Sequence, residues 1–157
     1  MVSADYLVGL TDGEGCFYVN VRPPNVKRFS FRVETHFYIK LKEDELSLLR
    51  EVRESFGCGV IYYQKEKRKN HSPCYRFEIN NHQDLIKNLI PFFKKHPLHS
   101  SKRKSFEIFC KILDLIEKKE HFSEDGLEKI RKLKSQMNIG ARRVREIRSL
   151  GGNATKL

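Results

Sequence analysis

The chain has 157 residues, and its 31 Lys and Arg outnumber its 20 Asp and Glu, which gives a formal net charge of +11. Hydrophobic residues make up 39% of the chain, which suffices for one core, and the many aromatic residues exclude a largely disordered protein. No stretch resembles a membrane-spanning helix, and the first residues lack the basic leader of a secretory signal. We therefore expect one intracellular domain without membrane contact, and the positive charge favours a nucleic acid as its partner.

The four cysteines stand far apart, and no two of them have the Cys-x-x-Cys spacing of a zinc or redox site. We interpret them as reduced, mostly buried thiols, which agrees with an intracellular location. The six His are scattered as well, so we expect no zinc site. The sequence does not distinguish a cytoplasmic or nucleoid location from an organelle such as a mitochondrion or chloroplast.

Hydrophobic periodicity predicts the elements in chain order. Residues 4–12 form a short apolar helix that ends at Gly13-Glu14-Gly15, and residues 16–22 alternate as a strand. A longer strand over 29–40 places apolar residues at every second position, which indicates one buried and one polar face. The remaining predictions are a helix at 43–56, strands at 60–68 and 74–80, and helices at 82–90 (ending near Pro91), 101–119 and 124–137.

The order of these elements is α-ββ-α-ββ-α, followed by further helices. Antiparallel hairpins that are segregated from the helices indicate an α+β fold, in which an antiparallel sheet carries helices on one face. We expect a single domain over residues 1–138 and a basic, Gly-containing tail over 139–157.

One segment is much more specific than the rest. Leu7-Val8-Gly9-Leu10-Thr11-Asp12-Gly13-Glu14-Gly15 combines two leucines, a glycine within the helix and an acidic residue between two glycines. This segment resembles the signature of the LAGLIDADG homing endonucleases, although alone it would also suit a short core helix ended by glycine. The resemblance covers about residues 3–120. Further segments that look like this family are Phe37-Tyr38-Ile39-Lys40-Leu41, Phe56-Gly57-x-Gly59, Tyr75-Arg76-Phe77, Ile90-Pro91-Phe92-Phe93 and Ser101-Lys102-Arg103-Lys104.

The motif also predicts a dimer on physical grounds. Glycine at position 9 has no side chain, so a second helix can approach α-helical residues 4–12 closely at this point. The chain has one such motif, and one helix can pair with the same helix of a second copy about a two-fold axis. The residues that we expect in this dimer interface are Leu7, Val8, Gly9, Thr11 and Asp12.

The same pairing would create a metal site. The C-terminal end of a helix carries partial negative charge and unsatisfied carbonyls, and Glu14 adds a full negative charge there. Two such ends place Glu14 and the Gly13 carbonyl of both copies near one axis. This oxygen-rich pocket suits Mg²⁺, and other divalent cations such as Mn²⁺ or Ca²⁺ could also occupy it.

The resemblance implies an enzyme that hydrolyses both strands of duplex DNA as a metal-dependent homodimer. It implies that Glu14 and the Gly13 carbonyl hold the metal ion. It also implies that the positive charge of Lys102, beside them, orients or activates the water molecule or offsets the charge of the phosphate. Asp12 also matches the motif, and we interpret it as structural. Many relatives carry a polar residue near the end of the second strand, where this chain has Leu41, so the group that organises the catalytic water stays unassigned.

The polar faces of the strands would read base pairs in the major groove, although they would also suit an ordinary solvated sheet. An RNA-binding maturase that helps an intron to fold, or a DNA-binding protein that does not cleave, stays as an alternative function. The candidate DNA-binding residues are Tyr18, Asn20, Arg22, Arg32, Glu34, His36, Tyr38, Lys40, Tyr62, Gln64, Arg68 and Arg76.

Overall fold

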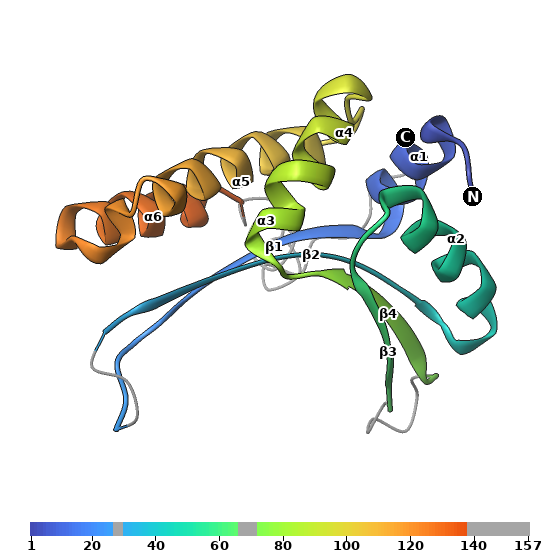
Figure 1. Cartoon of the computed structure of the whole chain (residues 1–157), viewed down its shortest axis with the longest axis horizontal. Coiled ribbons are helices and arrows are strands. Elements are labelled where there is room, and N and C mark those ends of the chain that lie inside the picture. Colours follow the sequence, from blue (N-terminus) through green and yellow to red (C-terminus); the bar gives the residue numbers. More distant parts are fainter. Residues whose placement is uncertain (27–29, 66–71, 138–157) are drawn as a thin grey trace, which may run out of the picture.

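The computed structural model describes residues 1–26, 30–65 and 72–137. The four strands are β1 (Gly15–Arg22), β2 (Arg32–Lys42), β3 (Val60–Gln64) and β4 (Cys74–Ile79). They form an antiparallel sheet with the order β1-β2-β4-β3, which bends into an arch, and the helices lie on its convex side (Figure 1). This architecture confirms the predicted α+β fold. The predicted tail over 139–157 lies outside the described residues. In the described ranges, no helix is both long enough and apolar enough to cross a bilayer.

Helix α1 (Ala4–Glu14) begins and ends where local chemistry favours it. The Ser3 hydroxyl accepts a hydrogen bond from the Tyr6 amide at 3.2 Å and caps the first turn. The helix runs into the first strand without an intervening loop. A Cβ added at Gly15 would lie 2.8 Å from the carbonyl oxygen of Thr11, so the junction requires a glycine.

One face of the sheet is buried under the helices, and the other is turned to the concave side of the arch. The first two strands alternate as the sequence predicts, whereas three consecutive residues of the strand over 74–79 (Phe77, Glu78 and Ile79) are all buried. Phe37 and Phe77, on the two central strands, are fully buried. The second strand starts later than predicted and extends further, and the predicted end of the third strand, at 66–68, lies outside the described residues.

The other helices follow the predicted apolar stripes. In α2 (Leu46–Phe56), Leu49 and Val52 are buried, and the helix ends at Gly57, whose positive φ of 67° favours glycine. A 3₁₀ turn over Glu43–Glu45 precedes α2, and another over Glu120–Phe122 precedes the last helix. The remaining helices are α3 (His82–Asp84), α4 (Ile90–Lys95), α5 (Lys102–Glu117) and α6 (Glu124–Met137).

The prediction that the helix over 82–90 ends near Pro91 is wrong, because the helical path continues to Lys95. A wide turn over Leu85–Leu89 connects α3 to α4, and the Ile90 amide bonds to the Leu85 carbonyl, five residues earlier. A proline inside a regular α-helix loses one hydrogen bond and collides with the preceding turn. The wider turn accommodates Pro91, which the sequence pattern alone could not reveal.

Phenylalanines join the sheet to the helices. The ring centroid of Phe17 on β1 lies 5.2 Å from that of Phe37 and 5.5 Å from that of Phe109 on α5. Helices α1 and α5 both pack against β1. The core therefore brings the C-terminal end of α1 and the N-terminal end of α5 together, and these two ends form the candidate active site.

Candidate active site and nucleic-acid interface

The end of α1 brings the predicted acid and the predicted lysine into one place. Lys102, the first residue of α5, donates hydrogen bonds from Nζ to the carbonyl oxygens of Thr11 at 3.0 Å and Gly13 at 2.9 Å. Glu14, the last residue of α1, is exposed beside them. Burial lowers the pKa of Lys102, and the nearby negative charge of Glu14 acts in the opposite direction. A half-buried cation therefore lies against the negative end of α1.

Asp12 holds the loop that positions Lys102. Its carboxylate accepts hydrogen bonds from the His99 amide at 2.9 Å, the Ser100 amide at 3.2 Å and the Ser100 hydroxyl at 2.6 Å. The Ser100 hydroxyl oxygen in turn accepts from the Lys102 amide at 3.2 Å. Burial alone would raise the pKa of Asp12, but the hydrogen bonds from Ser100 and His99 outweigh it and lower that pKa. These contacts agree with a structural role for Asp12.

The oxygen donors at the end of α1 suit a hard divalent cation. Glu14 contributes a carboxylate, and the Gly13 carbonyl, although bonded to Lys102, keeps a second lone pair for another partner. Within the described part of the chain, no group of three or more His, Cys, Asp or Glu side chains could hold a metal ion. Glu14 and the Gly13 carbonyl are therefore the oxygen donors that this helix end offers to a cation.

The predicted dimer interface divides between two faces of α1. Leu7, Val8 and Thr11 are 1%, 5% and 0% exposed, because they face the core of their own chain. The Asp12 carboxylate faces the loop before α5. Among the predicted interface residues, Gly9 alone is exposed. The motif has apolar residues on several sides of the helix, so the sequence alone could not show which side packs against the core of the same chain.

The outer face of α1 is open. A Cβ added at Gly9 or at Gly13 would have no heavy atom within 4 Å, apart from its chain neighbours and its own helix backbone. Tyr6, one turn before Gly9, is 46% exposed. A second copy that packs against α1 would therefore meet the surface formed by Tyr6, Gly9 and Gly13, which we call the glycine face of α1.

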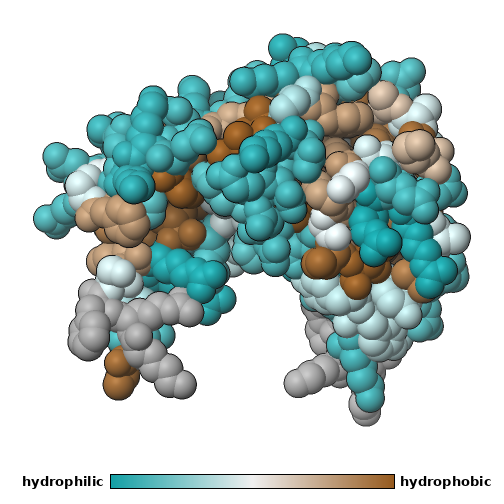
Figure 2. Space-filling model, in the orientation of Figure 1, coloured by the Kyte–Doolittle hydropathy of each residue, from teal (hydrophilic) through white to brown (hydrophobic). Residues whose placement is uncertain are grey.

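The outward-facing residues of the strands gather on the concave side of the sheet. In Figure 2 the molecule is hollowed beneath the sheet, and hydrophilic residues line the middle of this hollow. Tyr18 is exposed there, while Lys40 and Gln64 are half-buried. Asn20 is partly engaged, because its side-chain oxygen accepts from Lys134 of α6 at 3.1 Å. The predicted DNA-binding residue Arg68 lies outside the described residues.

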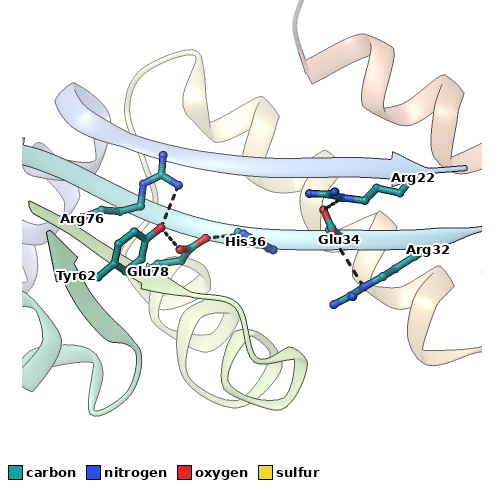
Figure 3. Close-up of polar contacts among 7 residues, drawn as sticks. All are labelled: Arg22, Arg32, Glu34, His36, Tyr62, Arg76 and Glu78. Carbon is teal, nitrogen blue, oxygen red and sulfur yellow. Dashed lines mark hydrogen bonds and ion pairs between the residues drawn. The ribbon is translucent and has the colours of Figure 1, made fainter. Parts of the chain in front are cut away.

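Glu34 lies between two of the predicted DNA-binding arginines (Figure 3). Its carboxylate is 2.7 Å from Arg22 Nε and 3.8 Å from Arg32 Nε. Burial would raise the pKa of Glu34, but the hydrogen bond and charge of Arg22 outweigh burial and lower that pKa. Glu34 is thus ionised, and the positive charges of Arg22 and Arg32 compensate its negative charge.

A second cluster surrounds Glu78, which is 5% exposed (Figure 3). Its carboxylate accepts from the Tyr62 hydroxyl and lies 2.5 Å from His36 Nδ1. Arg76 donates from Nη1 to the Tyr62 oxygen at 3.3 Å, and its guanidinium lies 3.9 Å from the centre of the Tyr38 ring. The cluster ties four of the predicted DNA-binding side chains to one buried acid.

A protein-family model described as LAGLIDADG endonuclease matches residues 7–113 of this chain. The chain belongs to the LAGLIDADG endonuclease family. The match includes the motif at the end of α1, all four strands and Lys102. The family resemblance that the sequence predicts is therefore confirmed.

Solved structures of LAGLIDADG endonucleases share this fold. The homing endonuclease I-TnaI is 36% identical, and the match covers 93% of this chain and 98% of that chain with a TM-score of 0.75. I-SmaMI, solved bound to an uncleaved DNA target in the presence of calcium ions, is 27% identical. That match covers 87% of this chain and 45% of I-SmaMI with a TM-score of 0.77.

The names of curated relatives describe them as probable intron-encoded endonucleases. "Probable intron-encoded endonuclease 3" of Neurospora crassa is 29% identical over 133 residues, and the match covers 84% of this chain and 24% of that protein. "Probable intron-encoded DNA endonuclease 1" of Mycosarcoma maydis is 26% identical over 102 residues, covering 65% of this chain and 34% of that protein. The chain thus spans about a quarter to a third of the length of these relatives.

In this LAGLIDADG endonuclease, Glu78 lies among the predicted DNA-binding residues but is not one of the residues that the sequence pattern predicts. Residues 76 and 78 are two positions apart in β4, so the two-residue period of a strand already places Glu78 on the same face as Arg76. From the sequence pattern alone, an acidic residue at this position would be expected to face solvent or DNA. Only the tertiary structure shows that Tyr62 and His36 enclose it.

Proposed function

We propose that this LAGLIDADG endonuclease is a site-specific homing endonuclease that cleaves both strands of a duplex DNA target as a metal-dependent homodimer. The observation that carries the proposal is the contact of Lys102 with the end of α1, beside Glu14. A cation and an acid held at one helix end are the groups that phosphodiester hydrolysis needs. The named relatives are endonucleases, which supports the same reaction class.

Glu14 and the Gly13 carbonyl would hold the metal ion, and we expect Mg²⁺ as the physiological one. Their oxygen donors are the type that Mg²⁺ prefers, and the solved I-SmaMI complex with DNA contains calcium ions. When bound, such an ion polarises the scissile phosphate and lowers the pKa of a coordinated water molecule. The Lys102 ammonium would offset the negative charge that develops on the phosphate, because Asp12 and the end of α1 fix its position.

The proposed homodimer rests on the glycine face of α1. The chain has one LAGLIDADG motif, so one copy supplies a single Glu14. The open space at Gly9 and Gly13 allows the α1 helices of two copies to approach each other closely. Their C-terminal ends would then meet, and two carboxylates and two carbonyls would surround the metal ion.

The concave side of the sheet would lie along the duplex. Its charged and polar side chains suit base edges in the major groove, and the high net positive charge suits phosphates. The structure of I-SmaMI with its DNA target supports duplex DNA as the substrate.

The experiment is a cleavage selection from a random duplex library with Mg²⁺, followed by the Glu14→Gln variant. We expect the wild-type protein to cut a roughly symmetric site, and the variant to bind that site with similar affinity and leave it uncut. Glu117→Gln, at an exposed position on α5, is the matched control and should cut normally. Cleavage by Glu14→Gln would reject Glu14 as the metal ligand. Binding of an intron RNA without cleavage of any duplex by the wild type would favour a maturase instead.

A further inference from the structure

The Glu78 cluster has hydrogen bonds whose direction can be worked out atom by atom. Arginine has only donors, so the contact between Arg76 Nη1 and the Tyr62 oxygen uses that oxygen as an acceptor. The Tyr62 hydroxyl proton must therefore point to the Glu78 carboxylate, its other contact. Burial and this hydrogen bond to Glu78 raise the pKa of Tyr62, so the hydroxyl keeps its proton at neutral pH.

An ionised carboxylate only accepts hydrogen bonds. Glu78 accepts from Tyr62 at one oxygen, and its other oxygen lies 2.5 Å from His36 Nδ1. When Glu78 is ionised, the proton in this second contact belongs to the imidazole. A neutral imidazole with its proton on Nδ1 has a bare Nε2, which is a hydrogen-bond acceptor.

The Nε2 atom of His36 is accessible. His36 Nε2 is not among the buried side-chain atoms that lack a hydrogen-bond partner in the described residues. Those atoms belong to Thr11, Arg76, His82 and His121. No hydrogen bond within the described ranges uses His36 Nε2, and the His36 side chain is 29% exposed on the concave side of the sheet. This acceptor is therefore free for a molecule that approaches the concave side.

The surroundings of His36 hold its ring in place. Glu78 on β4 bonds its Nδ1, and the Tyr18 ring on β1 lies with its centroid 5.7 Å from that of the imidazole. On β2 itself, Glu34 is two residues away on the same face, and Arg22 on β1 already pairs with it. The ring is thus fixed from two strands, as direct readout of a base requires.

We propose that Glu78 is a positioning residue that locks His36 in the Nδ1-protonated form, so that His36 Nε2 reads an exocyclic amino group in the major groove. Such a group marks adenine (N6) or cytosine (N4), whereas guanine and thymine present acceptors at the corresponding edge. The proposal rests on the DNA interface proposed above. Glu78 itself is too buried to reach a base, and its effect on specificity passes through His36.

The first test uses the free protein and does not depend on nuclease activity. The tautomer of His36 is measured by the ¹⁵N chemical shifts of its imidazole in NMR, at a pH where these shifts no longer change as the pH is raised. The His36→Ala variant identifies the signal among the six His. We expect a protonated Nδ1 and a bare Nε2. A proton on Nε2 under these conditions would overturn the proposal.

The matched variants are Glu78→Gln and Tyr62→Phe. The glutamine can still accept from Tyr62, and its amide group then donates to His36 Nδ1, which moves the imidazole proton to Nε2. Tyr62→Phe removes the other hydrogen bond of Glu78 and leaves the His36 contact, so the tautomer should stay as in the wild type. Unchanged His36 shifts in Glu78→Gln would contradict the lock.

The second test is the base preference of duplex binding, measured for every base pair of the selected target. The wild type should prefer adenine or cytosine at one symmetric pair of positions. Which of these two bases is preferred shows whether His36 contacts adenine N6 or cytosine N4. Glu78→Gln should reverse this preference by roughly 5- to 10-fold toward guanine or thymine, and His36→Ala should remove it. A uniform loss of affinity at all positions would show a merely structural role for Glu78.

Discussion

The Lys102 ammonium nitrogen lies 2.9 Å from the carbonyl oxygen of Gly13, which joins the first residue of α5 to the last turn of α1. A cation at the N-terminal end of a helix opposes the dipole of that helix. Here the unfavourable position is offset by the negative C-terminal end of α1 and by Glu14. The contact links the motif at the start of the chain to a lysine far along it.

Replacement of Lys102 by methionine should abolish most of the cleavage activity. The methionine keeps the apolar stem but removes the charge beside the scissile phosphate, so the cleavage rate should fall by about 100-fold or more. Duplex binding should change by only a few-fold. Single-turnover cleavage and filter binding measure the two effects, and Lys102→Arg, which keeps the charge, should retain more activity. Equal cleavage by the wild type and Lys102→Met would refute the proposed role.

Replacement of Asp12 by asparagine should destabilise the fold. The variant weakens the hydrogen bonds that Ser100 and His99 donate to a charged group, which should cost about 1–2 kcal/mol in the free energy of unfolding at neutral pH. The exposed Asp44→Asn exchange is the control and should change it by less than about 0.5 kcal/mol. Urea denaturation followed by circular dichroism measures both.

The effect of Asp12→Asn should depend on pH. The folded-state pKa of Asp12 is lower than its ordinary value of about 3.9, so its carboxylate stabilises the fold above that value. This contribution disappears as the pH falls through the lowered pKa. The difference in unfolding free energy between the wild type and the variant should therefore shrink below about pH 4. A constant difference across this range would contradict the assignment.

Replacement of Gly9 by leucine should prevent dimer formation without harming the single chain. The position is open within one copy, and leucine favours a helix more than glycine by up to about 1 kcal/mol. A second α1 helix could no longer approach, so analytical ultracentrifugation with target DNA should show a single copy. The exposed Arg50→Leu exchange on α2 is the matched control and should leave the dimer intact. A dimer that survives Gly9→Leu would place the interface elsewhere.

Binding to duplex DNA should weaken steeply with salt. Two copies carry 2 × (+11) = +22 formal charges, and each phosphate contact releases condensed counterions. With about 6–10 phosphate contacts, affinity should fall by about 10³- to 10⁵-fold between roughly 50 and 200 mM salt. Fluorescence anisotropy over this range measures the slope. A flat dependence would show that the concave side does not follow the DNA backbone.

The family, the α+β class and the alternation that turns polar side chains of β1 and β2 to one face of the sheet were predictable from the amino-acid sequence. These features depend on local patterns: a nine-residue motif at the end of α1, and apolar residues at every second position in β1 and β2. The same periodicity predicted α6 with its observed bounds. It failed at Pro91, because the wide turn before α4 leaves no mark on the hydrophobic pattern.

The packing of segments that are distant in the chain sets which polar groups meet. The contact of Lys102 with Gly13, the enclosure of Glu78 and the outward direction of the glycine face of α1 all depend on segments far apart in the chain. A hydrogen bond needs two groups within about 3 Å of each other, and sequence periodicity gives the face of a side chain but not its distance to a partner. Packing of α1 and α5 on β1 sets these distances.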